Sequence, residues 1–73
     1  MNRLEELRIA AGYESQRELA AEINRRANGD RAKEVSYTSI ARMEANDANP
    51  RWSIVNTLAR FFGVSAEYLM GED

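Results

Sequence analysis

Apolar residues recur at helical spacing along the whole chain, and this pattern constrains its fold more than any other feature. Large apolar side chains return every three or four residues, as on one face of an α-helix, and no segment shows the two-residue alternation of a half-buried strand. The 73 residues correspond to one small domain. We therefore predict an all-α fold, with residues 1–73 forming a single compact domain in which five short helices surround one core.

The first two predicted helices have clear boundary signals. In the first, four residues form the apolar face: Leu4, Leu7, Ala10 and Ala11. Gly12 is suited to close this helix, because glycine readily adopts the left-handed conformation. Ser15 and Glu18 then have the spacing of a capping box, which predicts the start of a second helix. The apolar stripe of this helix has three residues: Leu19, Ala20 and Ile23.

A polar segment, residues 24–34, separates the second helix from the third and contains no large apolar residue. We expect the second helix to end at about Ala27 and a mobile loop to follow, with its turn at residues 28–30. Val35 is the next core candidate, and Ser36 can cap a third helix. One face of that helix carries three residues: Ile40, Met43 and Glu44.

The last part of the chain repeats these signals. Asn46 can end the third helix, and residues 47–50 then form a loop. Ser53 is a candidate cap for a fourth helix that ends at Gly63, and Ser65 is a candidate cap for a short fifth helix. The fourth helix contains the densest apolar stretch: Ile54, Val55, Leu58, Ala59, Phe61 and Phe62.

The composition excludes most catalytic and metal chemistry. The chain has no cysteine and no histidine, so it lacks thiol nucleophiles and the commonest zinc ligands. We expect no enzymatic activity, no cofactor, no metal and no small-molecule substrate. No apolar run approaches the ~20 residues of a membrane helix, and residues 1–6 do not resemble a signal peptide. We therefore expect a cytoplasmic protein with no membrane contact.

The net charge of −2 differs from the strongly basic character of most nucleic-acid-binding domains. The cations are nevertheless concentrated in the middle of the chain. Residues 15–51 contain seven basic and six acidic side chains, whereas the rest of the chain contains three basic and six acidic side chains. Nine of the ten cations are arginine, whose planar fork suits phosphate and guanine edges. On charge alone, a mixed, solvated surface is the favoured explanation, and charge does not decide the function.

Several segments, in the same order, resemble the Cro/CI-type (lambda-repressor-like) helix-turn-helix repressor family. The resemblance is carried by Leu7-Arg8 with Gly12, by SQRELA at residues 15–20, by VSYTSIARME at residues 35–44, by Pro50, and by Leu58-Ala59, Gly63-Val64-Ser65 and Tyr68-Leu69. The chain departs from the family at residues 24–34, an insertion where the family has a tight turn between the second and third helices, and at Ala45-Asn46, where the family commonly has Asn-Gly. A longer surface loop costs only ~0.6 kcal/mol per doubling, so the two helices can still dock.

The resemblance implies that the third helix, at about residues 36–45, enters the major groove of double-stranded DNA. The DNA-binding residues implied are Gln16, Arg17, Ser36, Tyr37, Thr38, Ser39, Ala41, Arg42 and Arg51. Arg42 would bind guanine O6 and N7 and Thr38 would touch a thymine methyl group, with Tyr37 and Ala41 on the same base-facing side. Ser36, Ser39 and Arg51 would contact phosphates or act as caps, and Gln16 would contact a phosphate or remain solvated.

The function implied is a transcriptional regulator, a repressor that acts as a homodimer with Tyr68, Leu69 and Met70 as interface candidates. Arg8 and Glu44 would form a partly buried ion pair between the first and third helices. The insertion's cations, Arg25, Arg26, Arg31 and Lys33, would either follow flanking phosphates or simply be solvated. The alternative function is a protein-interaction module of antitoxin-like type whose main partner is a protein.

Overall fold

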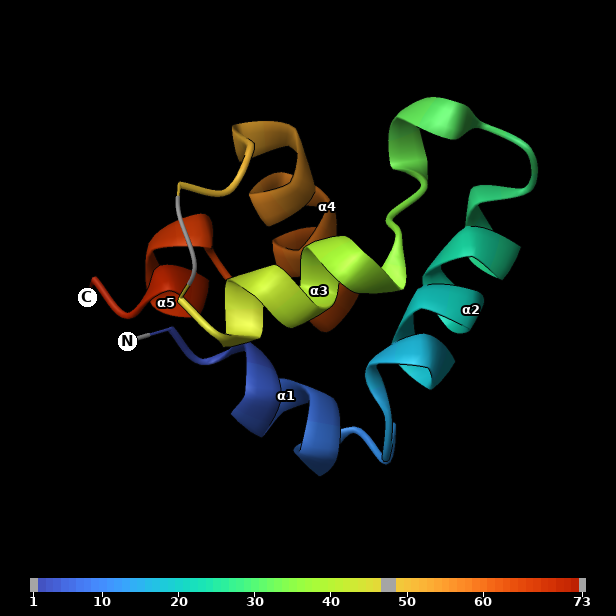
Figure 1. Ribbon diagram of the computed structural model, residues 1–73. Coiled ribbons are helices and arrows are strands. Elements are labelled where there is room, and N and C mark those ends of the chain that lie inside the picture. Colours follow the sequence, from blue (N-terminus) through green and yellow to red (C-terminus); the bar gives the residue numbers. More distant parts are fainter. Residues whose placement is uncertain (1, 47–48, 73) are drawn as a thin grey trace.

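The computed structural model describes residues 2–46 and 49–72 of the chain (Figure 1). Over these residues the chain forms five α-helices, one short 3-10 helix and no strand, which confirms the predicted all-α class. The elements are α1 (Leu4–Ala10), α2 (Gln16–Ala27), η1 (Arg31–Lys33), α3 (Tyr37–Glu44), α4 (Trp52–Phe62) and α5 (Ala66–Met70). Helix α3 lies across α4, with α1 and α2 on its flanks and α5 beside the N-terminal segment (Figure 1). None of these helices is long and apolar enough to cross a membrane.

Three helices begin at the serines predicted to cap them. The Ser15 hydroxyl accepts from the Glu18 N–H at 3.1 Å, and the Ser15 N–H donates to the Glu18 carboxylate at 3.0 Å, which completes the capping box. Ser36 caps α3, and Ser65 caps α5, each by accepting the N–H of the residue three positions later. These local hydrogen bonds satisfy backbone donors that the first helical turn leaves unpaired.

The predicted start of α4 is wrong. Ser53 is not its N-cap, because the helix already begins at Trp52, with Arg51 as the capping residue. The Arg51 backbone is extended, and its carbonyl accepts from the N–H groups of Ile54 and Val55 at 3.0 and 3.1 Å. A backbone of this shape can begin a helix without a side-chain cap, and Ser53 is left inside the first turn.

The insertion between α2 and α3 is more ordered than the predicted loop. Helix α2 ends at Ala27 as expected, and Asn28 follows in the left-handed conformation. The chain then forms η1, whose first turn is capped by the Asp30 carboxylate. The Asn24 side chain donates to the Val35 carbonyl at 3.0 Å and accepts from the Val35 N–H at 2.8 Å. This two-point clamp fixes the place where the insertion returns to the core.

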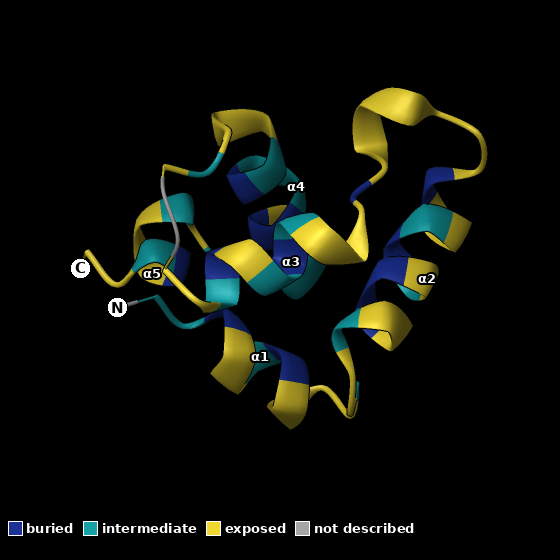
Figure 2. Cartoon of the chain, viewed as in Figure 1, coloured by how far each residue is buried: buried dark blue, intermediate teal, exposed yellow. Residues whose placement is uncertain are grey.

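One core holds the helices together, as Figure 2 shows by the buried faces turned toward the centre. It contains Leu4, Leu19, Ala20, Ile23, Val35, Ile40, Met43, Val55, Leu58, Ala59 and Leu69. The predicted apolar face of α1 is only partly correct, because Ala10 and Ala11 are exposed. The short helix turns Leu4 and Arg8 inward instead, and Arg8 is 6% exposed. A charged side chain therefore occupies a core position, where it needs a partner.

Candidate nucleic-acid interface

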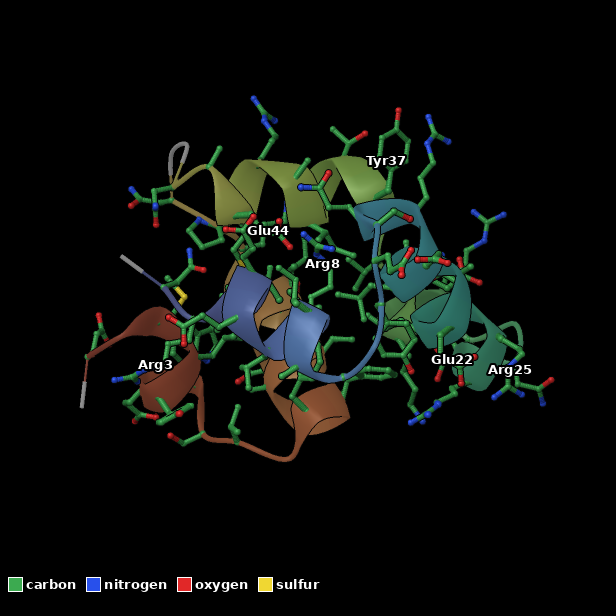
Figure 3. The ribbon with its side chains drawn as sticks, turned by 90° about the horizontal axis from the view of Figure 1, so that it is seen from below. Arg3, Arg8, Glu22, Arg25, Tyr37 and Glu44 are labelled. Carbon is green, nitrogen blue, oxygen red and sulfur yellow. The ribbon has the colours of Figure 1, made fainter. Side chains whose placement is uncertain are left out.

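Helix α3 presents a stripe of mixed chemistry to solvent. Tyr37, Thr38 and Arg42 are exposed and Ala41 is half-buried, whereas the opposite face of the helix packs in the core. Figure 3 shows Tyr37 at the outer edge, pointing away from the body of the fold. These positions are i, i+1, i+4 and i+5 of one helix, so they form a single surface that a partner can approach.

The Arg17 side chain adds a cation to this surface by stacking on Tyr37. Its guanidinium carbon lies 3.9 Å from the centre of the Tyr37 ring, and both side chains are exposed. The stack joins the first turn of α2 to the first turn of α3. A stacked guanidinium keeps the N–H groups at its edge available for hydrogen bonding while its rotation is restricted.

Gln16 has a partner inside the protein. Its Nε2 donates to Oε1 of Glu44 at 2.9 Å, and the side chain is half-buried. One amide hydrogen is therefore used to hold α2 against α3, an interaction that no local sequence pattern predicts. The predicted phosphate contact of Gln16 stays a prediction that depends on the second amide hydrogen.

The predicted pair between Arg8 and Glu44 is present and buried. Arg8 Nε lies 2.7 Å from Glu44 Oε2 and Nη2 lies 3.2 Å from Oε1, while Nη1 donates to the Tyr13 carbonyl at 2.9 Å. The two side chains are 7% and 6% exposed. The hydrogen bonds from Arg8 to Glu44 raise the pKa of Arg8, against the lowering effect of its burial. This fork-to-fork geometry fixes the orientation of α3 relative to α1.

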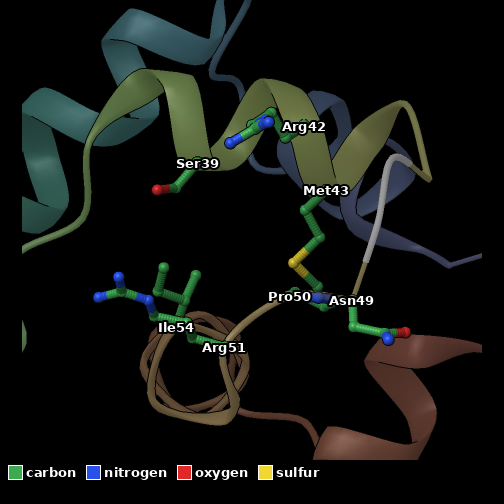
Figure 4. Close-up of a pocket in the computed structure, with 7 residues that line it drawn as sticks. All are labelled: Ser39, Arg42, Met43, Asn49, Pro50, Arg51 and Ile54. Atoms are coloured by element: carbon green, nitrogen blue, oxygen red, sulfur yellow. The ribbon is translucent and has the colours of Figure 1, made fainter.

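A pocket of about 350 Å³ lies beside this stripe, between α3 and the start of α4 (Figure 4). It is lined by Ser39, Arg42, Met43, Asn49, Pro50, Arg51 and Ile54. Arg42 from α3 and Arg51 from the start of α4 therefore line the same pocket. The resemblance implies different roles for them, a base contact for Arg42 and a phosphate contact or cap for Arg51. The first-turn N–H groups of α4 have no side-chain cap, and the helix dipole favours an anion near them. Two cations and a helix start at one opening suit a phosphate group.

The two serines of α3 have different positions in this site. The Ser36 hydroxyl accepts from the Ser39 N–H at 3.2 Å, so it acts as a cap. The two hydroxyl oxygens are also 3.1 Å apart. Ser39 is half-buried and lines the pocket, where its hydroxyl faces the same opening as Arg42.

Three cations of the insertion contact acidic side chains away from the α3 surface. Arg25 and Arg26 contact the Glu22 carboxylate at 2.6 and 2.7 Å, and Lys33 lies 3.8 Å from Asp30. Hydrogen bonds from Arg25 first, and then from Arg26, lower the pKa of Glu22 from 4.5 to about 2. Figure 3 shows Glu22 and Arg25 on a different side of the fold from Tyr37. The structure does not bring these side chains into the α3 surface.

Two further positioning interactions also have no counterpart among the predictions from sequence. Asn2 Nδ2 donates to the Met43 carbonyl at 2.6 Å and to Asn46 Oδ1 at 3.0 Å, which ties the N-terminal segment to the end of α3. The Tyr13 carbonyl accepts a hydrogen bond from Nη1 of Arg8. The Asn2 partners are 41 and 44 residues away along the chain, and no local pattern encodes such an interaction.

Known proteins offer no independent guide to this site. Comparison with protein-family models, with curated proteins and with solved structures gives no significant match to this chain. Within residues 2–46 and 49–72, no cluster of three or more acidic, histidine or cysteine side chains is placed to hold a metal ion. The chemistry available at the α3 surface is therefore that of arginine, hydroxyl and aromatic groups.

Proposed function

We propose that this protein is a sequence-specific DNA-binding transcriptional regulator, a repressor that occupies a promoter and performs no catalysis. The observation that carries the proposal is the exposed stripe of α3, bordered by Arg17 at one end and by Arg42 and Arg51 at the other. A helix with side chains of this kind fits the major groove. The buried Arg8–Glu44 pair supports the proposal, because it holds the stripe at a defined angle.

The geometry suggests how the contacts are divided. Arg42 reads a guanine edge, and the Thr38 methyl group contacts thymine. Arg51, Ser39 and the start of α4 hold a backbone phosphate at the shared pocket, which places α3 in the groove. Arg17, flattened on Tyr37, contacts a second phosphate or base edge at the other end of the helix.

The proposed assembly on DNA is a homodimer. Leu69 cannot contribute to a subunit interface, contrary to the expectation from sequence, because it is 0% exposed within its own chain. Tyr68 is 38% exposed and Met70 is half-buried, so they remain the candidates. A two-fold dimer would place its α3 helices in half-sites ~34 Å apart, one turn of the duplex.

The test is selection of bound sequences from a random duplex pool, followed by fluorescence anisotropy on the selected duplex at several salt concentrations. We expect one enriched, two-fold symmetric sequence and tighter binding to it than to a scrambled duplex. Arg42→Ala should weaken binding to the selected duplex and relax the preference at one position of each half-site, while Arg60→Ala, an equal loss of charge on the exposed side of α4, should leave the preference unchanged. A pool that yields no enriched sequence, with no salt-dependent retention on random duplex, would contradict the proposal.

A protein-interaction module is the second candidate function. It is favoured by a separate observation, a groove between α2, η1 and α4 that contains none of the residues proposed to contact DNA.

A further inference from the structure

A second pocket, of about 300 Å³, opens between α2, η1 and α4. It is lined by Ile23, Arg26, Ala27, Lys33, Thr57, Arg60 and Phe61. Lys33 belongs to η1, so the insertion supplies part of the wall, and the Asn24–Val35 clamp holds that wall in place. We call this pocket the α2–α4 groove. Its size falls at the lower end of the range for ligand pockets, about 300–1,000 Å³.

The cations of the groove form its rim. Three of the seven lining residues are cations and none is acidic, in a chain whose net charge is −2. Lys33 is 68% exposed, and its contact with Asp30 is long, at 3.8 Å. Arg60 is exposed and forms no ion pair with any residue in the described part of the chain. Lys33 and Arg60 can therefore form ion pairs with the carboxylates of a partner molecule without first losing a strong ion pair within this chain.

The floor of the groove is apolar. Ile23 and Ala27 are 4% and 6% exposed, and the half-buried Phe61 ring closes one side. The Arg26 guanidinium lies 4.6 Å from the centre of that ring, where the Glu22 carboxylate also holds it at 2.7 Å. This arrangement holds Arg26 over the Phe61 ring, where its charge is already paired with Glu22, so Lys33 and Arg60 are the rim cations left to pair with a carboxylate of a partner.

We propose that the α2–α4 groove binds an acidic segment of a partner protein, with one large apolar side chain of that segment seated against Phe61. The carboxylates of the segment pair with Arg60 and Lys33, and its apolar anchor is shielded from water by the stems of the same side chains. A buried anchor surrounded by a charged rim is the usual anatomy of a small protein interface.

The apolar floor is what distinguishes this partner from a nucleic acid. A phosphate backbone has no group that gains from contact with Ile23, Ala27 and the Phe61 ring, whereas leucine or phenylalanine does. The inference does not depend on DNA binding, because none of the residues proposed to contact DNA lines the groove. A regulator with this groove would engage DNA and a protein with different faces.

The experiment titrates the full ¹⁵N-labelled chain with an acetylated, amidated peptide, Asp-Glu-Asp-Phe-Glu-Asp-Glu, at physiological salt. A second peptide with serine in place of the phenylalanine is the matched probe. We expect saturable amide shifts at Ile23, Ala27, Lys33, Thr57 and Phe61 and at least tenfold weaker binding of the serine peptide.

Variants of the protein test the groove itself. Arg60→Glu and Thr57→Trp should each weaken binding of the phenylalanine peptide at least tenfold, because the first repels its carboxylates and the second fills the groove. Arg31→Glu, the same charge change on η1 outside the groove lining, should weaken it less than threefold.

Four results would overturn the proposal. They are no shifts at ~1 mM peptide, shifts confined to Tyr37–Glu44, equal binding of both peptides, or the same groove shifts with a random DNA duplex. Circular dichroism melts of each variant separate a loss of binding from a loss of folding. Binding of Arg60→Glu to the selected duplex is expected to be retained, which separates this inference from the proposed DNA-binding function.

Discussion

Arg8 and Glu44, 36 residues apart in the chain, meet as a two-point ion pair that is almost completely withdrawn from solvent. Both carboxylate oxygens are used, and Oε1 also accepts from Gln16. The remaining Arg8 nitrogen is satisfied by the Tyr13 carbonyl. Three segments, α1, the start of α2 and the end of α3, therefore converge on one carboxylate, and the orientation of α3 depends on it.

Replacing Arg8 alone with methionine should destabilise the fold by about 3–5 kcal/mol, because it leaves the Glu44 charge buried without its partner. The double variant with Arg8→Met and Glu44→Leu should lose much less, since both charges are then removed. Urea unfolding of the single and double variants measures the difference. A single variant with an unchanged midpoint would mean that this pair contributes no more than an exposed one, ~0–1 kcal/mol.

Arg42→Ala and Arg51→Ala should have different effects on DNA binding. The first should cost ~1–3 kcal/mol on the selected duplex and relax the preference at one position of each half-site. The second should weaken binding about equally on all sequences and lower the salt slope by about one. Because the two side chains share one pocket, the double variant should depart from additivity. Equal, sequence-independent losses from both single variants would rule out base reading through Arg42.

The Arg17–Tyr37 stack should make these two residues interdependent. Tyr37→Phe keeps the aromatic face and should leave the contribution of Arg17 to DNA binding intact, whereas Tyr37→Leu should reduce it by ~0.5–1 kcal/mol, the value of an exposed cation–π interaction. A double-mutant cycle with Arg17→Ala, read by anisotropy on the selected duplex, gives the coupling. Strictly additive losses in the leucine cycle would show that the stack has no part in binding.

Neutralising the four cations of the insertion, Arg25, Arg26, Arg31 and Lys33, should leave the salt slope of DNA binding unchanged. Arg25 and Arg26 pair with Glu22, which lies on a different side of the fold from Tyr37. Anisotropy at salt concentrations from about 50 to about 200 mM measures the slope, which decreases by about one for each phosphate that the protein no longer neutralises. A markedly shallower slope would instead place the insertion along the flanking phosphates.

Acidification should reveal the stabilising effect of Glu22. Its pKa is lowered from 4.5 to about 2 in the folded protein, so the unfolded chain binds more protons between these two values. The unfolding free energy should therefore fall as the pH drops from 4.5 to about 2, and Glu22→Gln should show a flatter decline over this window. Urea unfolding at steps across it provides the comparison. The variant with Arg25→Gln and Arg26→Gln should flatten the decline in the same way, and parallel curves for all three proteins would contradict this assignment.

Local sequence determined the helices and most of their ends. Ser15, Ser36 and Ser65 cap helices because a hydroxyl oxygen reaches the N–H three residues later, and that interaction needs no distant partner. The left-handed residues Asn28 and Asn46 end α2 and α3 for an equally local reason. Ser53 is not a cap because the extended backbone at Arg51 begins α4 earlier, and backbone conformation after the Pro50 loop does not follow from side-chain type alone.

Tertiary structure decided how the helices use their faces. The inward turn of Arg8 and the exposure of Ala10 and Ala11 follow from packing α1 against a carboxylate that comes from α3. The rim shared by Arg42 and Arg51, the Asn24–Val35 clamp and the α2–α4 groove likewise join segments that are separated along the chain. Hydrogen bonds within a helical turn can be predicted from spacing, because helix geometry fixes their distance. Contacts between helices depend on crossing angles set by the whole core, and only the folded chain specifies those angles.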